Sequence, residues 1–376
     1  ASIHGSSARM RPKSACAVCA QEVLCALSKW RAGAFGGGPA SYILKGTGRR
    51  WWAATFAVLI TITFGLAFNS VQSNTIADAF GEAFGIPRMA TATALTVLTL
   101  IIIWGGIRSI ARFSQWVVPV MAVAYIILAL YIIGANISRV PEVLSMIFEE
   151  AFGFREALGG TVGMALVMGT KRGLFSNEAG EGSAPNVAAT ASVSHPVKQG
   201  LIQALGVFTD TLLICTCTAF IILCSGVYSD GETTANGIVL TQQAIESQTG
   251  GAGLGATFVG IAIFFFAFTS IVANYYYGET NLRFLRDSRG LVAAYRLCVG
   301  GMVFAGAMAS LGAVWTFADI TMALMTLCNV AAIFVLGKWA LACLDDYRVQ
   351  RRHGIDPKFH SYTMPEIADK IKVWDA

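Results

Sequence analysis

The chain has 376 residues, of which 55% are hydrophobic and only 13% are charged. Soluble domains carry about 25% charged residues, so this composition excludes an ordinary soluble enzyme and favours a polytopic membrane protein. The formal net charge of +5 is accounted for by basic loops on one side of a bilayer, and it requires no nucleic acid as a partner.

Residues 1–18 are rich in Ser, Ala and Arg and lack the long apolar core of a secretory signal. The first convincing span is 51–67, and it continues into a polar run at 69–75. Polar side chains at membrane depth face a cavity or form hydrogen bonds between helices. The residues leave both interpretations of this run open.

Together with 51–67, the other apolar segments predict about eight spans in total when one interrupted segment at 159–193 is included. The other spans are expected at 90–104, 116–133, 195–224, 254–276, 291–311 and 318–343. An interfacial helix is expected at 141–154 and a soluble, cytoplasmic tail at 346–376. The transmembrane domain therefore covers 19–345.

Lysine and arginine mark the loops expected in the cytoplasm, because short cytoplasmic loops are enriched in these residues. The basic segments are 45–50, 108–112, 171–198, 283–289 and the tail, whereas 226–252 has no Lys or Arg and is expected outside. The signs alternate consistently, so the chain is expected to start and end inside.

The interrupted segment begins with a ten-residue apolar run, 159–168, which is too short to cross a bilayer. Charges, four glycines and a proline follow in 169–186. Transporters use helices broken in this way to expose backbone groups to substrate and ions. The alternative is a cytoplasmic loop after an ordinary short helix.

Three further residues in the predicted spans carry chemistry. Asp210 places a carboxylate inside a span, where it is functional or pairs with Lys171, Arg172 or a nearby hydroxyl. Thr269 and Ser270 supply adjacent hydroxyl oxygens, which suit a sodium ion. Alternatively, both hydroxyls bond back to the preceding helical turn.

The chain has no nucleophile–base constellation, no phosphate-binding loop and no dinucleotide fingerprint, so we expect neither an enzyme nor an ATP-driven pump. No repeated filter motif supports a channel. One CxxC without a second pair is weak support for a metal site, so no cofactor is expected. Ion-coupled secondary transport remains.

The chain resembles the alanine/glycine:cation symporter family. The similarity lies in 37–43, 69–74, 169–180, 182–185, 195–200, 205–211, 276–279 and 314–319, and it covers roughly 19–345. It implies an all-α, LeuT-type inverted repeat of five plus five helices, in which 159–186 is the broken helix of the second half and the loop after it. It also implies uptake of alanine or glycine coupled to sodium or protons, in a bacterial inner membrane.

The resemblance also implies roles for individual residues. Gln72, Ser270 and Asn274 would face the substrate, Gly169 and Thr170 would lie at unwound backbone, and Thr269 with Ser270 would bind sodium. Gating or coupling is assigned to Lys171, Arg172, Asn177, Glu178 and Asp210.

Two departures from the family pattern are visible. Many members carry Trp at the position of Asn274, so the pocket here would differ in volume and polarity. The family's first broken helix, which supplies half of the site, is absent. We therefore expect this chain to be an N-terminally truncated member that binds substrate poorly alone. The alternative is a non-transporting scaffold, fragment or sensor derived from the same fold.

Overall fold

The computed structural model describes residues 17–28, 30–32, 34–105, 108–152, 161–228, 235–251, 253–371 and 374. The start of the expected interrupted segment, 159–160, and most of 1–18 lie outside these residues.

Within the described residues, seven helical segments are long and apolar enough to cross a membrane. They are α3 (Arg50–Ile62) with η1 (Thr63–Phe68) and α4 (Asn69–Phe84); α5 (Arg88–Gly105); α6 (Arg108–Ala135), whose spanning part begins at Trp116; α10 (Pro196–Phe208) with η3 (Thr209–Cys215) and α11 (Thr216–Ser225); α13 (Leu254–Leu285); α14 (Arg289–Met308); and α15 (Leu311–Arg352). The prediction of a multi-pass helical membrane protein is confirmed.

Shorter elements connect the spans. They are α1 (Ala17–Ser28), α2 (Pro39–Thr47), η2 (Ile137–Arg139), α7 (Val140–Phe152), α8 (Thr161–Asn177), α9 (Pro185–Ala188), α12 (Ile238–Gln248), η4 (Ser361–Thr363) and η5 (Pro365–Lys370). The strands β1 (Trp30–Ala32) and β2 (Ala34–Gly36) form one small antiparallel pair, a minor departure from the all-α expectation. The expected interfacial helix is α7.

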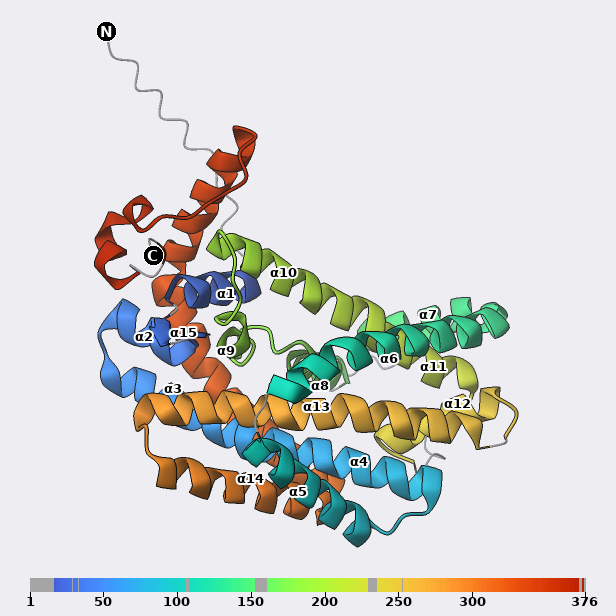
Figure 1. Ribbon diagram of the computed structural model, residues 1–376. Coiled ribbons are helices and arrows are strands. Elements are labelled where there is room, and N and C mark those ends of the chain that lie inside the picture. The colour runs from blue at the N-terminus through green and yellow to red at the C-terminus, as the bar shows by residue number, and fades with distance from the viewer. Residues whose placement is uncertain are drawn as a thin grey trace.

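The continuous rod α3–η1–α4 lies alongside α13, with α14 and α5 packed on the same side (Figure 1). Small residues allow these helices to approach closely. A Cβ atom added to Gly306 of α14 would lie 2.7 Å from the Cβ of Ser70 in α4. At this contact the Asn74 Nδ2 donates to the carbonyl oxygens of Gly306 at 2.9 Å and Ala309 at 2.8 Å. Part of the polar run at 69–75 therefore forms an interhelical seam.

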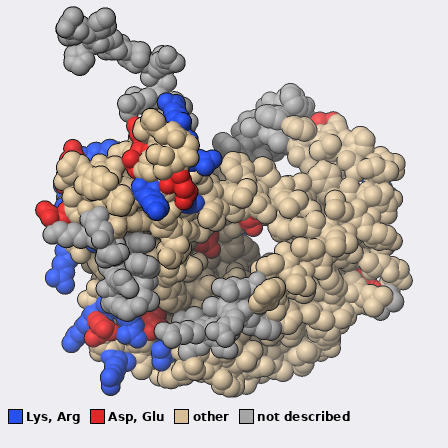
Figure 2. Space-filling model, turned by 45° about the horizontal axis from the view of Figure 1, so that its top comes forward, with Lys and Arg blue, Asp and Glu red and all other residues tan. Residues whose placement is uncertain are grey.

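Charged side chains gather at one end of the molecule. The start of α3, the junction of α13 with α14, and the start of α10 lie at the same end, and α12 lies at the opposite end (Figure 1). Figure 2 shows Lys, Arg, Asp and Glu concentrated on one part of the surface, with a broad uncharged surface elsewhere. This segregation agrees with the orientation expected from the basic loops, which stays a prediction.

The expected boundary of the tail lies inside a helix, because α15 continues to Arg352. The segment after it folds back on the start of α10. The Phe359 amide donates to the Ser194 carbonyl oxygen at 2.9 Å, and the Lys198 ammonium lies 2.6 Å from Asp356 Oδ1. The tail is thus docked on the loop before α10.

The break after α8 lies later than we expected. Residues Gly169 and Thr170 belong to the regular helix α8, so the expectation of unwound backbone at these positions is wrong. Glycine within a helix is tolerated at a cost of about 1 kcal/mol. The helix ends where Glu178 adopts a φ of 53° and Gly180 a φ of 87°.

Candidate functional site

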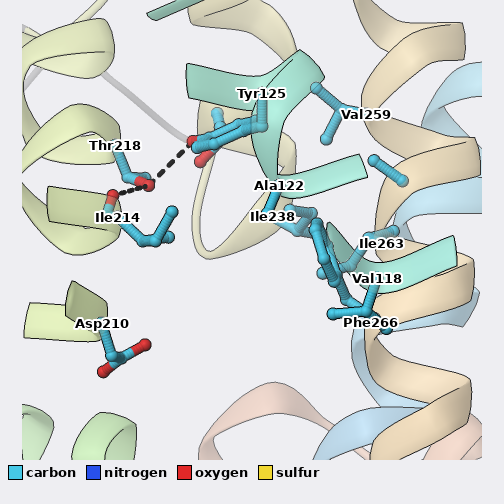
Figure 3. A pocket seen from close by; sticks show the side chains of 12 residues that line it. Val118, Ala122, Tyr125, Asp210, Ile214, Thr218, Ile238, Val259, Ile263 and Phe266 are labelled. Atoms are coloured by element: carbon cyan, nitrogen blue, oxygen red, sulfur yellow. Dashed lines mark hydrogen bonds between the residues drawn. The ribbon is translucent and has the colours of Figure 1, made fainter. Parts of the chain in front are cut away.

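A cavity of about 510 Å³ lies between α6, η3, α11, α12 and α13 (Figure 3). Its lining is Val118, Ala122, Tyr125, Asp210, Ile214, Thr218, Ile238, Thr241, Val259, Ala262, Ile263 and Phe266. Most of these side chains are apolar, and few carry a polar group. Mostly apolar walls with a few placed polar groups are typical of small-molecule sites.

Two of the polar groups in the cavity bind each other. The Tyr125 hydroxyl lies 2.8 Å from the Thr218 Oγ1, and Thr218 also donates to the Ile214 carbonyl oxygen at 3.1 Å (Figure 3). Asp210 stands at another side of the cavity, at a distance from this pair (Figure 3). The carboxylate of Asp210 is thus the one acidic group among the residues that line the cavity.

Asp210 lies on the π-helical turn η3, which interrupts the regular hydrogen bonding of the α10–α11 span. Single π-helical turns inside helices frequently occur at functional sites. The Ser176 hydroxyl of α8 donates to Asp210 Oδ2 at 2.6 Å and lies 3.1 Å from the Cys215 Sγ. Of the structural partners that the sequence left open for Asp210, the structure gives a hydroxyl rather than Lys171 or Arg172.

One face of α13 continues from the cavity to the predicted substrate residues. Ile263 and Phe266 line the cavity, and Ser270 and Asn274 follow at spacings of four, so all four lie on one face of the helix. The hydroxyls of Thr269 and Ser270 both donate to the Phe266 carbonyl oxygen at 2.9 Å. The back-bonded alternative is therefore confirmed, and each hydroxyl oxygen keeps lone pairs that can accept a cation.

Asn274 is buried with 4% of its surface exposed, and its Nδ2 has no hydrogen-bond partner among the described residues. An unpaired buried amide costs roughly 1–3 kcal/mol, so this donor is available for an acceptor that the described residues do not supply. Gln72 lies on the adjacent α4, is partly buried and makes no side-chain hydrogen bond to a described residue in the structure. Both residues therefore offer side-chain amide groups for hydrogen bonding near this face of α13.

The structure does not bring Gly169 and Thr170 to this face of α13. Both residues are exposed on α8, and no atom lies within 4 Å of the position that a Cβ of Gly169 would take. Helix α8 packs chiefly on α7 and η3. Their predicted contact with substrate stays a prediction.

The predicted coupling residues at the end of α8 form a link to α15. The Arg172 Nη2 lies 2.7 Å from both carboxylate oxygens of Asp319, and the Lys171 ammonium lies 3.8 Å from Asp319 Oδ2. The Arg172 guanidinium also stacks on Trp315, 4.1 Å from the ring centroid. The ion pair and the aromatic contact together attach α8 to the start of α15.

Aromatic rings extend this link into the core. Phe175 of α8 lies between Trp315 and Phe68, with ring centroids 4.5 Å apart in both cases. Phe68 in turn contacts Phe64 at 4.4 Å. A row of rings thus joins α8 to η1 and α15.

Asn177 and Glu178 shape the chain where α8 ends. Asn177 Nδ2 donates to the Thr211 hydroxyl at 3.2 Å, and Asn177 Oδ1 accepts from the Ala179 amide at 2.9 Å. The Ser183 hydroxyl donates to the Glu178 carboxylate. Burial raises the pKa of Glu178 to about 7, and the negative charge of Asp210 adds to this effect.

Sequence reasoning missed several residues that the structure places here. Tyr125 and Thr218 are ordinary polar residues in apolar spans, and nothing in their spacing indicates that they meet. Glu181 could have been predicted as a functional residue, because it is a carboxylate within the glycine-rich segment 169–186. It is fully buried in the structure.

These features define a multi-pass membrane protein with a small apolar cavity and polar groups along one helix. The sequence profile of the sodium:alanine symporter family matches residues 15–361. The chain belongs to this family of transporters.

Three relatives illustrate the match. The chain is 47% identical over 341 residues to the amino-acid carrier protein AlsT of Bacillus subtilis, covering 91% of this chain and 72% of AlsT. It is 50% identical over 326 residues to the probable sodium/glutamine symporter GlnT of the same organism, covering 87% of this chain and 67% of GlnT. It is 35% identical over 310 residues to the sodium/alanine symporter AgcS of Methanococcus maripaludis, covering 81% and 67%.

Proposed function

We propose that the chain carries the transport core of a sodium-coupled symporter for a small neutral amino acid, alanine or glycine. Membership of the sodium:alanine symporter family carries this proposal. The free amide of Asn274, on the α13 face that leads from the cavity, supports it with a polar group suited to a small zwitterion. No enzymatic step is involved, because the family consists of transporters.

The proposed sodium ligands are the hydroxyl oxygens of Thr269 and Ser270. Both hydroxyl hydrogens are directed to the Phe266 carbonyl oxygen, which leaves the oxygen lone pairs for a cation. Two neutral oxygens are too few to hold an ion alone, since secondary transporters add unwound backbone carbonyls and further side chains. The order of elements supports a LeuT-type arrangement in which α8, α10–α11, α13, α14 and α15 form the second half.

A second candidate substrate is glutamine. One relative at 50% identity is named a probable sodium/glutamine symporter, and the cavity of about 510 Å³ gives room for a side chain longer than a methyl group. The amides of Gln72 and Asn274 could pair with a substrate amide, because an amide both donates and accepts hydrogen bonds.

The test is uptake of radiolabelled alanine, glycine and glutamine into proteoliposomes, with and without an inward sodium gradient. This chain is measured beside a fusion in which the part of AlsT that precedes the matched region is joined to residue 19. We expect sodium-dependent uptake by the fusion, with little uptake by the chain alone. Folded protein without uptake in either form would contradict the proposal and favour a non-transporting scaffold. Equal uptake by both forms would refute the expected need for the preceding helices.

A further inference from the structure

Residues 178–190, here called the 178–190 loop, follow α8 and are held by hydrogen bonds from three different helices. Cys25 Sγ of α1 donates to the Pro185 carbonyl oxygen, and Asn329 Nδ2 of α15 donates to the Gly180 carbonyl oxygen, each at 2.8 Å. Asn281 of α13 donates to Asn186 Oδ1, also at 2.8 Å. The short helix α9 within the loop packs on α1 and α13 (Figure 1). The loop therefore closes one end of the helix assembly.

The fit of this loop is tight at Gly182, whose φ is 96°. A Cβ atom at this position would lie 2.8 Å from Phe56 Cζ, 2.9 Å from Pro39 Cγ and 3.0 Å from Asn329 Cγ. Helices α2, α3 and α15 thus leave no space beside the backbone. A group enclosed by the loop is separated from water as long as the loop stays in place.

Glu181 is such a group. Its exposed fraction is 0%, and neither carboxylate oxygen has a hydrogen-bond partner among the described residues. An ionised carboxylate in this situation costs several kcal/mol, because it loses its hydration and gains no partner. The closed loop therefore favours a form of Glu181 that carries a bound positive ligand.

The titratable groups on and near the 178–190 loop restrict which positive ligand Glu181 can carry. Its charged neighbour is Glu178, and the elements packed on the loop present Cys25 of α1, Tyr42 of α2 and Asp210 of η3. Lys45 of α2 interacts with Cys25.

Burial raises the pKa of Glu181 well above its usual range, and the negative charge of Glu178 raises it further. Within the part of the chain that the structure describes, no cluster of three or more His, Cys, Asp or Glu could hold a metal ion. A proton needs one oxygen only.

We propose that Glu181, with Glu178 beside it, is a proton-binding site that is complete only while the 178–190 loop is closed. The proton comes from the aqueous phase as the loop closes and returns to it as the loop opens. Deprotonation leaves a buried negative charge, so a rise in pH shifts the loop toward the open form. Opening of the loop would admit solute between the helices, and only this consequence rests on the proposed function.

Infrared spectra of the purified protein in lipid nanodiscs test for the bound proton without any substrate. The wild-type spectrum minus the Glu181→Gln spectrum should contain a protonated carboxyl C=O band at neutral pH, because the partly protonated Glu178 contributes to both spectra. This difference band should shift in heavy water and remain when Glu366→Gln is measured in place of the wild type. Glu366 is the control, because its side chain is 78% exposed. The band should titrate far above the ordinary glutamate value of about 4.3. A difference band that titrates at that value, or the absence of any difference band, overturns the proposal.

A second variant keeps the test valid if Glu181→Gln fails to fold. Glu178→Gln removes the neighbouring negative charge and keeps the Glu181 carboxyl, so the midpoint of the band should move to lower pH. An unchanged midpoint contradicts the pairing of the two carboxyls.

Alkylation of Cys25 reports on the opening, because this thiol is fully buried beneath the loop. Thiol ionisation raises the alkylation rate of Cys25 in both proteins alike, so the informative quantity is the alkylation rate in the wild type divided by the rate in Glu181→Gln. We expect this ratio to rise at least threefold from pH 6 to pH 9. A constant ratio overturns the link to opening. Uptake assays test the proposed transport function separately. A missing infrared band with normal uptake rejects the proton site alone. An infrared band with the expected titration but no uptake rejects the transport function alone.

Discussion

Ser270 shows how one side chain can serve the helix and a ligand at once. Its hydroxyl hydrogen satisfies the Phe266 carbonyl oxygen, and the same oxygen atom keeps two lone pairs. Sequence reasoning treated back-bonding and ion binding as alternatives. The geometry shows that they are compatible, because the hydrogen and the lone pairs point in different directions.

We expect Ser270→Ala to raise the sodium concentration for half-maximal uptake by about tenfold in the transporting fusion. Loss of one oxygen ligand should weaken sodium binding by about 1.4 kcal/mol, which corresponds to a tenfold change in the dissociation constant. Thr316→Ala is the matched control, since Thr316 also back-bonds, to Gly312 at 2.8 Å, but is exposed on α15. An unchanged sodium dependence in Ser270→Ala would remove Ser270 from the ion site.

At the scale of elements, α8 is the segment whose function depends most on its attachments. The ion pair of Arg172 with Asp319 and the stacking on Trp315 connect it to α15. Charged residues in this run were predicted from sequence to act in coupling. The partner Asp319 could not be identified from the sequence, because 147 residues separate it from Arg172 and several acidic residues were equally available.

We expect the Arg172–Asp319 pair to contribute about 1–2 kcal/mol of coupling energy, because both side chains are partly buried. The measurement is a double-mutant cycle of thermal stability with Arg172→Ala, Asp319→Ala and the double variant. The same cycle on Lys338 and Glu366, an exposed pair 3.8 Å apart, should give less than about 0.5 kcal/mol. Equal coupling in the two cycles would show that α8 is not held by this pair.

The tail depends on His195, which was noticed in the sequence only as the start of a helix. His195 is fully buried, its Nε2 lies 3.1 Å from Asp346 Oδ2, and its Nδ1 accepts the Val197 amide at 3.2 Å. The ring also packs edge-on against Phe359 of the tail. It therefore connects α10, α15 and the docked tail.

Burial lowers the pKa of His195 below 6.5, although Asp346 opposes this effect. The docked state thus binds fewer protons than the undocked state, so its stability is complete above pH 6.5 and falls as the pH drops below that value. We expect limited proteolysis of the tail to be faster at pH 5.5 than at pH 7.5, with the difference reduced in His195→Gln. His360→Gln, at an exposed ring in the tail, should behave like the wild type. Cleavage rates independent of pH would refute this role.

Across the whole molecule, the positions of seven apolar spans followed from composition and hydropathy, because a bilayer imposes a minimum length on every apolar helix. Their lengths did not, since α3–η1–α4, α13 and α15 extend well beyond the expected bounds. The end of α8 did not follow from them. The family resemblance implied unwound backbone at Gly169 and Thr170, whereas backbone with positive φ begins only at Glu178. Glycine marks where a break is possible, and tertiary packing decides whether it occurs. The cavity could not be predicted either, because its lining combines residues of α6 with residues of η3, α11, α12 and α13, which lie about 90 to 150 residues further along the chain.

The orientation of the protein in the membrane can be tested at the two ends of its spans. The junction of α13 with α14, which contains Arg283, Arg286 and Arg289, lies at the same end as the start of α3, and α12 lies at the other end (Figure 1). Short basic loops remain in the cytoplasm. We expect Ser247→Cys, exposed on α12, to react in intact cells with a membrane-impermeant maleimide, whereas Ile355→Cys in the tail should react only after permeabilisation.

The background for this labelling replaces Cys16, Cys19 and the exposed Cys298 by alanine, and the same background without an added cysteine is the control. Labelling of Ile355→Cys but not Ser247→Cys in intact cells would show that the protein has the opposite orientation in the membrane. Inversion would place the 178–190 loop on the outer face and expose Glu181 to external rather than cytoplasmic pH. The topology therefore determines which compartment exchanges protons with the proposed site.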